Sequence, residues 1–253
     1  MIEKAYLRTC DGFICNSHTT AQRVKSLIGR KHILLQDPDF QVAYPAGDTY
    51  GRADSDQWVR RKQGRAELVR ILFLGNVIPR KNLECLLKAL AEIKGLSWEC
   101  DVLGNMDIDP RYSNRILRMR KRLGLSNRVL LHGKVEDKEI HDFLKNAQLL
   151  AVPSFYEGLG IIFLEAMNWG LVPIAGNSGG VREVVRHKEN GFLADPHKPH
   201  ILARYIESLI KKPELRQDYA LKAWRDSGKF PAWETAFEGL DQWLRAIAGA
   251  GHK

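Results

Sequence analysis

Residues 153–167 read PSFYEGLGIIFLEAM and place two glutamates, Glu157 and Glu165, eight positions apart across a glycine turn that opens a helix. Glu157 falls in the loop, where its carboxylate can accept hydrogen bonds from hydroxyl groups. Glu165 lies about a turn and a half further in, within reach of a ribose. The pattern therefore suits a sugar joined to a diphosphate. The plainer alternative is a strand–turn–helix unit with two solvated acids.

The turn itself supplies groups that bind phosphate. Gly158 and Gly160 let the backbone turn and approach a ligand without a Cβ in the way. The N–H groups near Gly160, Ile161 and Ile162 form the free start of the helix, and such N–H groups receive phosphate oxygens. A phosphate site is expected at this helix start.

Working outward, strands and helices alternate from about residue 68 onward, as the hydrophobic period switches between two and 3.6. This alternation predicts an α/β fold, a doubly wound parallel sheet with ligands bound at the carboxyl ends of the strands. In contrast, Asp54 to Gly64 is polar and is expected to be exposed. The expected strands are Leu68–Leu74, Trp98–Leu103, Val129–His132, Leu149–Val152 and Val172–Ala175, and the expected helices are Leu83–Ile93, Asp109–Leu123, Asp137–Asn146, Gly160–Trp169 and Val181–Arg186.

With the surrounding residues added, the segment resembles the Glu-x7-Glu motif of retaining GT-B glycosyltransferases, in particular glycosyltransferase family 4 (glycosyl transferases group 1). Four other blocks fit the family in the same order and cover most of residues 68–200. They are Ile71 to Asn76 with Arg80-Lys81-Asn82, Val129 to Val135, Pro173-Ile174-Ala175 with Gly179 to Val185, and Asn190 to Pro196.

The resemblance implies a metal-independent transferase that uses a nucleoside-diphosphate sugar as substrate, needs no cofactor and retains the anomeric configuration. It implies catalytic roles for Lys81 and Glu157, whereas His132 receives none because a lone histidine at a strand end more often packs. Asn76 stands where the family often has arginine. One cation of the usual pair is therefore missing, which puts donor affinity or the catalytic rate in doubt unless Arg80 substitutes for it. The implied nucleotide-sugar-binding residues are Gly75, Asn76, Arg80, Lys81, His132, Gly133, Lys134, Glu157, Gly158, Gly160, Ile161, Ile162 and Glu165.

The two ends of the chain suggest further parts. Residues 1–47, with Ser17 as a helix N-cap, resemble a remnant of the N-terminal acceptor domain and its linker. Residues 48–228 resemble the donor-binding domain, and residues 229–253 the C-terminal crossover helix. The remnant is expected to pack on that helix, to expose an apolar patch, and to favour a separate acceptor-domain chain or a homodimer. The alternatives are a non-catalytic nucleotide-sugar-binding subunit of a split transferase and, third, a hydrolysing sugar epimerase.

Composition excludes several classes. With 253 residues, 44% of them hydrophobic and 27% charged, the chain has ordinary globular usage. No apolar run approaches the roughly 18 residues of a membrane span, and no signal-peptide pattern opens the chain, so a cytoplasmic location is expected. The net charge of +9 suits an anionic donor or peripheral association with the inner face of a membrane, and no motif reads nucleic acid. The cysteines, Cys10, Cys15, Cys85 and Cys100, lack metal or redox spacing and are expected to be buried thiols.

A metal-dependent alternative rests on Asp107 and Asp109, whose spacing matches the Asp-x-Asp of GT-A transferases. The same spacing recurs at Asp37-Pro38-Asp39 and Asp54-Ser55-Asp56, so the match has little specificity. Because Pro110 follows directly, a helix N-cap at Asp109 is expected instead, and no metal site is predicted.

Overall fold

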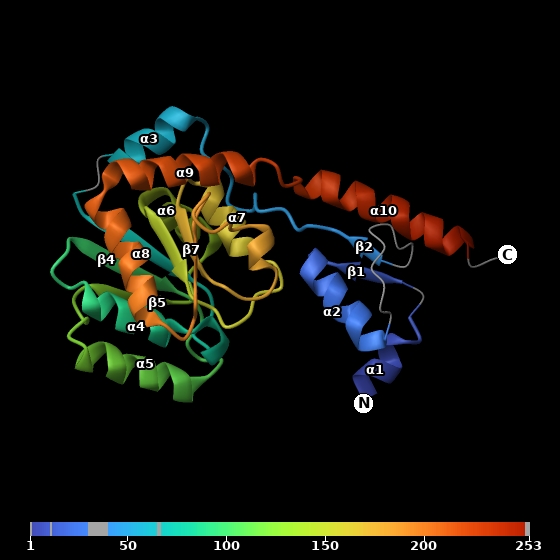
Figure 1. The fold of residues 1–253 in the computed structure, drawn as a ribbon, viewed down its shortest axis with the longest axis horizontal. Coiled ribbons are helices and arrows are strands. Elements are labelled where there is room, and N and C mark those ends of the chain that lie inside the picture. Colours follow the sequence, from blue (N-terminus) through green and yellow to red (C-terminus); the bar gives the residue numbers. More distant parts are fainter. Residues whose placement is uncertain (1, 11, 30–39, 65–66, 251–253) are drawn as a thin grey trace.

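Two parallel sheets of unequal size organise the chain (Figure 1). The computed structural model describes residues 2–10, 12–29, 40–64 and 67–250. The larger sheet has six strands in the order β5-β4-β3-β6-β7-β8, and the smaller pairs β1 with β2. The strands are β1 Phe13–Cys15, β2 Phe40–Val42, β3 Val69–Leu74, β4 Trp98–Leu103, β5 Val129–Gly133, β6 Leu149–Val152, β7 Val172–Gly176 and β8 Phe192–Ala194.

Helices cover both faces of the larger sheet. The chain runs outward from β3 in one direction through β4 and β5, and from β6 in the other through β7 and β8. Right-handed crossovers therefore put α4 and α5 on one face and α7 on the opposite face. The helices of this part are α3 Asp56–Gly64, α4 Leu83–Glu92, α5 Pro110–Arg122, α6 Asp137–Asn146, α7 Ile161–Asn168, α8 Pro199–Lys211 and α9 Pro213–Ser227, with short 3-10 turns at Pro79–Lys81 and Gly180–Glu183.

The core follows from strands that are covered on both sides. Ile71, Leu72 and Phe73 of β3 are all fully buried, so the strand reads as a continuous apolar run rather than an alternating one. β6 and β7 are buried along their whole length in the same way. The predicted doubly wound α/β sheet is confirmed. Its strand order reverses between β3 and β6, which is where such a sheet binds ligands.

An N-terminal unit stands apart from the larger sheet and consists of α1 Ile2–Leu7, β1, α2 His18–Ile28 and β2 (Figure 1). Ser17 caps α2 as predicted, because its hydroxyl oxygen accepts a hydrogen bond from Thr20 N at 3.0 Å. The last helix, α10 Trp233–Ala250, crosses back to this unit. A Cβ on Gly12 would lie 2.9 Å from side-chain carbons of both Trp243 and Ile247, so the unit packs on α10 as expected.

Two chain segments join the unit to the larger body. The linker that follows β2 carries Tyr44, and the segment before α10 carries Phe230. Their rings meet edge to face with centroids 5.5 Å apart. Further along the linker, Arg52 donates to Trp224 O of α9 at 2.5 Å. The predicted domain boundaries near residues 47 and 228 fall in these two segments and stay predictions.

The expectation that Asp54 to Gly64 is exposed was right only in part. Residues 56–64 form α3, in which Val59 and Gln63 are fully buried. Gln63 Nε2 donates to Gly170 O at 2.7 Å, and Gln63 Oε1 accepts from Arg216 Nε at 3.0 Å. Gln63 can be buried because its polar groups are paired inside the protein, whereas Asp54, Gln57, Arg60 and Arg61 are exposed as expected.

The sequence reading also missed β8, α8 and α9, which pack on the larger sheet and on α3, α4 and α7. Cys10 is exposed, contrary to expectation, whereas Cys15, Cys85 and Cys100 are buried. Among the described residues, no helix combines the length and the apolarity needed to cross a bilayer.

Candidate functional site

A cavity of about 450 Å³ opens where the strand order reverses, beside the loops that follow β3 and β6. We call it the β3–β6 cavity. Because neighbouring parallel strands end at one edge of the sheet, these loops meet although they are some 75 residues apart. The cavity is lined by Asn16, Arg80, Lys81, Tyr156, Glu157, Gly158, Leu159, Gly160, Ile161 and Ile162.

An ion pair between the two predicted catalytic residues forms one wall. Lys81 Nζ lies 2.6 Å from Glu157 Oε1, and both side chains are about nine-tenths buried. Ser154 Oγ donates to the same carboxylate oxygen at 2.6 Å. Among the described residues, Arg80 is the one partner of Glu157 Oε2, at 3.4 Å, so this oxygen keeps capacity to accept another hydrogen bond. This wall therefore offers a ligand one carboxylate oxygen of Glu157 and the half-exposed guanidinium of Arg80.

The absence of a side chain at Gly75 leaves room for the Lys81 side chain. The Lys81 side chain passes over Gly75, where an added Cβ would lie 3.2 Å from Lys81 Cε. Asn76, the position where the family often has arginine, is exposed, and its Oδ1 accepts from Asn105 N at 3.4 Å. Arg80 therefore supplies the second cation at this wall, and Asn76 lies outside the residues that line the cavity.

The start of α7 forms another part of the cavity wall and contributes backbone N–H groups. Gly160 is the N-cap in the left-handed region, with φ +89°, and an added Cβ would lie 2.7 Å from the Phe163 ring. No side chain caps the helix start, so N–H groups at Ile161 and Ile162 remain available where the helix dipole is positive. This arrangement can hold an anion.

Glu165 lies further along α7 and does not line the cavity. Burial raises the pKa of its carboxyl to about 7, with a hydrogen bond from Thr49 opposing the shift and Asp137 adding to it. Tyr50 lies in the same cluster, and its hydroxyl donates to Asp137 Oδ1 at 3.4 Å. Burial, helped by Glu165 and Asp137, raises the pKa of Tyr50 to about 12. The second glutamate thus faces the linker and the start of α6.

The predicted base-facing residues are not brought into the cavity. His132 and Gly133 end β5, which is an edge strand separated from β6 by β4 and β3, and Lys134 follows it. His132 Nε2 lies 2.7 Å from Asp101 Oδ1, and its ring packs against Phe143 with centroids 4.8 Å apart. The histidine side chain is therefore held by packing and hydrogen bonding.

The aspartates of the metal alternative lie elsewhere. Asp109 caps α5, as predicted, because its Oδ1 accepts from Tyr112 N at 2.9 Å. Neither Asp107 nor Asp109 lines the β3–β6 cavity, and Asp37-Pro38-Asp39 lies outside the described residues. In the part of the chain that the structure describes, no group of three or more His, Cys, Asp or Glu residues could hold a metal ion.

Glu183 joins the N-terminal unit to the larger body. Its Oε1 accepts from Thr19 N at 2.8 Å and from Thr19 Oγ1 at 2.6 Å, and its Oε2 accepts from His18 N at 3.0 Å and from Tyr44 Oη at 2.7 Å. Burial alone would raise the pKa of this carboxyl, but the hydrogen bonds outweigh burial and lower the pKa. Glu183 therefore acts as an N-cap for α2 supplied from another part of the chain.

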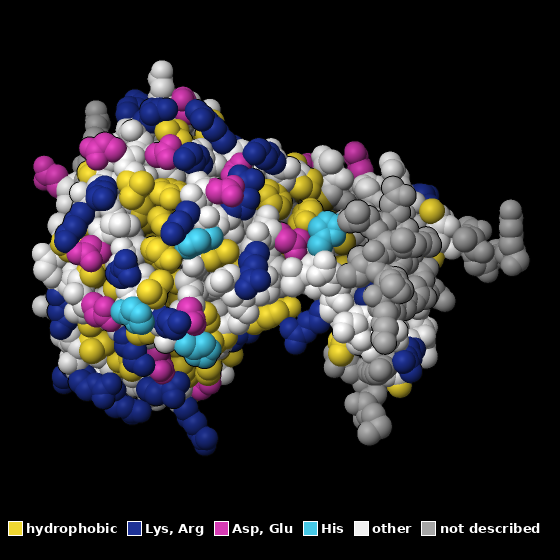
Figure 2. Space-filling model, in the orientation of Figure 1, with side chains coloured by type: hydrophobic (Ala, Val, Ile, Leu, Met, Phe, Trp, Pro, Cys, Tyr) yellow, Lys and Arg dark blue, Asp and Glu magenta, His cyan; other side chains and the backbone are white. Residues whose placement is uncertain are grey.

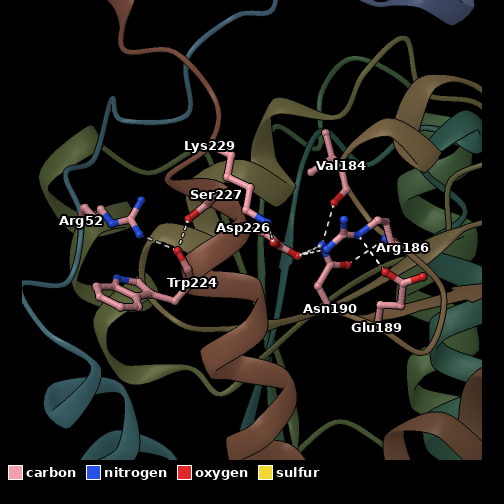
Figure 3. Close-up of polar contacts among 9 residues, drawn as sticks. All are labelled: Arg52, Val184, Arg186, Glu189, Asn190, Trp224, Asp226, Ser227 and Lys229. Atoms are coloured by element: carbon pink, nitrogen blue, oxygen red, sulfur yellow. Dashed lines mark hydrogen bonds and ion pairs between the residues drawn. The ribbon is translucent and has the colours of Figure 1, made fainter.

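A second cavity, of about 280 Å³, lies between Tyr44 and the end of α9. The Asp226 carboxylate at this cavity has three hydrogen-bond donors (Figure 3). It accepts from Lys229 Nζ at 2.6 Å, from Asn190 Nδ2 at 3.0 Å, and from Arg186. Burial would raise the pKa of Asp226, yet these partners lower it. This cluster fixes the end of α9 on the loop before β8.

Two features of the site had no signal in the sequence. Asn16 reaches the cavity from the N-terminal unit, and Tyr156 lies under the guanidinium of Arg23 at 5.0 Å from its ring centroid. Both depend on contacts between segments about 140 residues apart. Ser17 as an N-cap predicted where α2 begins, but it did not predict which part of the chain lies next to α2.

The family model "Glycosyl transferases group 1" matches residues 55–225, which include α3, the larger sheet and most of α9. The chain belongs to this family. Two curated relatives are D-inositol 3-phosphate glycosyltransferase of Rhodococcus erythropolis, 26% identical over 97% of this chain and 56% of the relative, and alpha-D-kanosaminyltransferase of Streptomyces kanamyceticus, 26% identical over 79% and 52%. The chain thus spans about half the length of these group 1 relatives.

Solved structures share the fold of this family member. HepE of Anabaena in complex with UDP and glucose has a TM-score of 0.78 at 24% identity and covers 96% of this chain and 67% of its own. Sucrose-phosphate synthase from Thermosynechococcus elongatus has a TM-score of 0.83 at 22% identity, covering 99% and 61%. The GT-B fold inferred for the chain is confirmed by this likeness.

Proposed function

We propose that the chain binds a nucleoside-diphosphate sugar in the β3–β6 cavity and that the protein transfers the sugar to an acceptor hydroxyl with retention, without a metal or cofactor. The observation that carries the proposal is the Lys81–Glu157 pair beside the open start of α7. Group 1 membership supports the reaction class. HepE, whose structure holds UDP and glucose, supports the ligand class.

In this mechanism the bond between the anomeric carbon and the diphosphate oxygen breaks, and the diphosphate leaves with the electron pair. The acceptor oxygen bonds to the anomeric carbon from the same face, and its proton passes to the leaving diphosphate. Arg80 and the N–H groups of Ile161 and Ile162 stabilise the charge that develops on the diphosphate. A positioned donor of this kind is worth about 3 kcal/mol in the transition state.

The two glutamates take different parts of the donor. Glu157 Oε2 accepts a hydrogen bond from a sugar hydroxyl, while Lys81 and Ser154 hold the other oxygen in place. Glu165 binds the ribose, and the backbone near His132, Gly133 and Lys134 faces the base. These assignments rest on the family resemblance. The cluster of Glu165, Thr49 and Tyr50 supports the ribose assignment, because it places hydrogen-bonding groups beyond the helix start.

A second candidate is a donor-binding subunit that needs a partner chain, or a second copy, for the acceptor side. It is favoured by exposed apolar side chains on the N-terminal unit and α10. Those side chains are Tyr6, Ile14, Leu27, Phe237 and Leu244. Sedimentation should then show association. A strictly monomeric chain that turns over donor alone would exclude this candidate.

Association with an anionic membrane surface is proposed through α5. Figure 2 shows Lys and Arg side chains along the lower edge of the larger body, where α5 lies in Figure 1. Leu117 on α5 and Ile108 just before it are exposed apolar side chains among these cations. The exposed cations of α5 are Arg111, Arg115, Arg118, Lys121 and Arg122. Binding to vesicles with anionic lipid, but not to neutral ones, would support this role.

A thermal-shift panel tests donor binding. UDP-glucose, GDP-mannose and ADP-glucose are compared, because a ligand of the folded state raises the melting temperature by mass action. We expect one donor to stabilise the wild type and the Glu157→Gln variant to lose that shift. Glu207→Gln, a change at a half-exposed position on α8, serves as the matched control. No shift with any donor at saturating concentration would refute the proposal, and loss of turnover on adding a chelator would refute its metal-independent part.

A further inference from the structure

The β3–β6 cavity is completed by one residue from the N-terminal unit. Of the described residues that line it, Asn16 alone lies outside residues 80–162. The Asn16 carboxamide lies beside Gly158, where an added Cβ would be 3.1 Å from Asn16 Nδ2. Ser17 Oγ donates to Gly158 O at 2.7 Å, which joins the two segments at this point. The amide is therefore part of the cavity wall.

The Asn16 side chain is oriented by its own helix. Thr20 Oγ1 donates to Asn16 Oδ1 at 2.9 Å, one turn into α2. Among the described residues, the amide nitrogen has no hydrogen-bond partner and the side chain remains exposed. Glu183 in turn fixes the start of α2 through Thr19 and His18. The structure thus holds an unused hydrogen-bonding group of Asn16 at the cavity in a defined position.

The chemistry of the wall indicates which ligand atom this group meets. In the proposed donor site, Arg80 and the N–H groups of α7 already bind the diphosphate. Phosphate oxygens are repelled by the Glu157 carboxylate, so they do not fit beside Asn16. A ring hydroxyl can do two things at once: it donates to Glu157 Oε2 and accepts from the Asn16 amide. A carboxylate paired with a carboxamide therefore fits the polyol part of the donor better than its phosphates.

We infer that Asn16 hydrogen-bonds to a hydroxyl of the donor sugar and is a specificity-determining residue supplied by the N-terminal unit. The inference rests on the proposed donor site. It adds that the N-terminal unit contributes a hydrogen bond to the sugar, whereas the nucleotide is bound by the larger body alone. Sugar selection then depends on the unit being joined to the larger body through Glu183 and Ser17.

The test compares Asn16→Ala with the wild type on two ligands, a nucleoside diphosphate and its sugar. The pairs are UDP with UDP-glucose, GDP with GDP-mannose, and ADP with ADP-glucose, and the pair that binds the wild type most tightly is used. We expect Asn16→Ala to weaken binding of the sugar nucleotide about tenfold, as for loss of one hydrogen bond, and binding of the free nucleotide less than about twofold. Asn16→Asp should weaken the sugar nucleotide further, because it adds a second carboxylate near Glu157.

Gln22→Ala is the matched control, since Gln22 is exposed on the same helix. It should change neither affinity, and circular dichroism should be the same for every variant. An unchanged sugar-nucleotide affinity in Asn16→Ala, or an equal loss for both ligands, would overturn the inference and leave the donor site standing. A wild type that binds none of the six ligands would refute the donor site itself, and the inference with it.

Discussion

Replacing Glu165 by glutamine should stabilise the protein at alkaline pH. Burial beside Thr49, Tyr50 and Asp137 raises the pKa of this carboxyl from an ordinary value of 4.5 to about 7. The difference of about 2.5 units corresponds to about 3 kcal/mol, at about 1.4 kcal/mol per unit. Glutamine is neutral at every pH and close in shape, so the Glu165→Gln variant avoids the penalty of burying the charge.

The sign of the effect follows from proton binding. A carboxyl whose pKa is raised on folding contributes its full stability below the unfolded pKa, near 4.5, and loses it as pH rises through about 7. The free energies of unfolding of wild type and variant should therefore agree near pH 4.5. They should separate between about pH 4.5 and pH 7 and then run parallel, with the variant more stable by about 3 kcal/mol at pH 8.

Urea unfolding followed by tryptophan fluorescence from pH 4.5 to 8.5 measures the difference, since the chain has six tryptophans. Glu207→Gln is again the control, because it removes the same charge at a half-exposed position that is paired with the neighbouring Lys211. Its curve should run parallel to the wild type. A difference between Glu165→Gln and wild type that does not change with pH, or a variant less stable at pH 8, would refute the reasoning.

Three further substitutions test other parts of the structure. Lys81→Met leaves the buried Glu157 carboxylate without its buried cation, with only the half-exposed Arg80 nearby among the described residues, and should lower the free energy of unfolding by about 3 kcal/mol, with Lys81→Met/Glu157→Gln recovering most of it in urea titrations. Gly47→Ala puts a methyl 2.3 Å from a β-carbon of α7 and should destabilise by about 2 kcal/mol in thermal melts, whereas Gly95→Ala, with open space, should not. The lowered pKa of Glu183 gives stability that is present above the unfolded pKa, near 4.5, and is lost as pH falls through the lower folded pKa. Glu183→Gln should therefore melt earlier than wild type at pH 7, and the difference should shrink only as pH falls below 4.5. A difference in melting temperature that stays constant as pH falls below 4.5 would contradict that assignment.

The larger sheet could be predicted because its strands carry their own signal. A buried parallel strand reads as an apolar run, and β3, β4 and β6 begin and end within one residue of the predicted bounds. The approach of Lys81 to Glu157 follows from topology, since the two residues follow neighbouring strands at the switch point. Local pattern and simple chain topology were enough for both.

The missed features depend on pairs that no local pattern contains. Gln63 is polar yet fully buried, because Arg216, which lies 153 positions away, satisfies its amide oxygen. Asn16 reaches the cavity only because Glu183 and Gly158 hold the start of α2. Periodicity describes which face of an element is apolar, but not which distant polar group makes burial of an amide favourable.

The edge-to-face contact of Tyr44 with Phe230 ties together the two chain segments that join the N-terminal unit to the larger body. Hydrogen bonds from Ser17 to Gly158 O and from Thr19 to Glu183 hold the same boundary at two further points. Asn16 stays beside Gly158 only while this boundary is closed. A sugar that hydrogen-bonds to both Asn16 and Glu157 would add a link across the boundary, and donor binding would then stabilise the N-terminal unit against separation from the larger body.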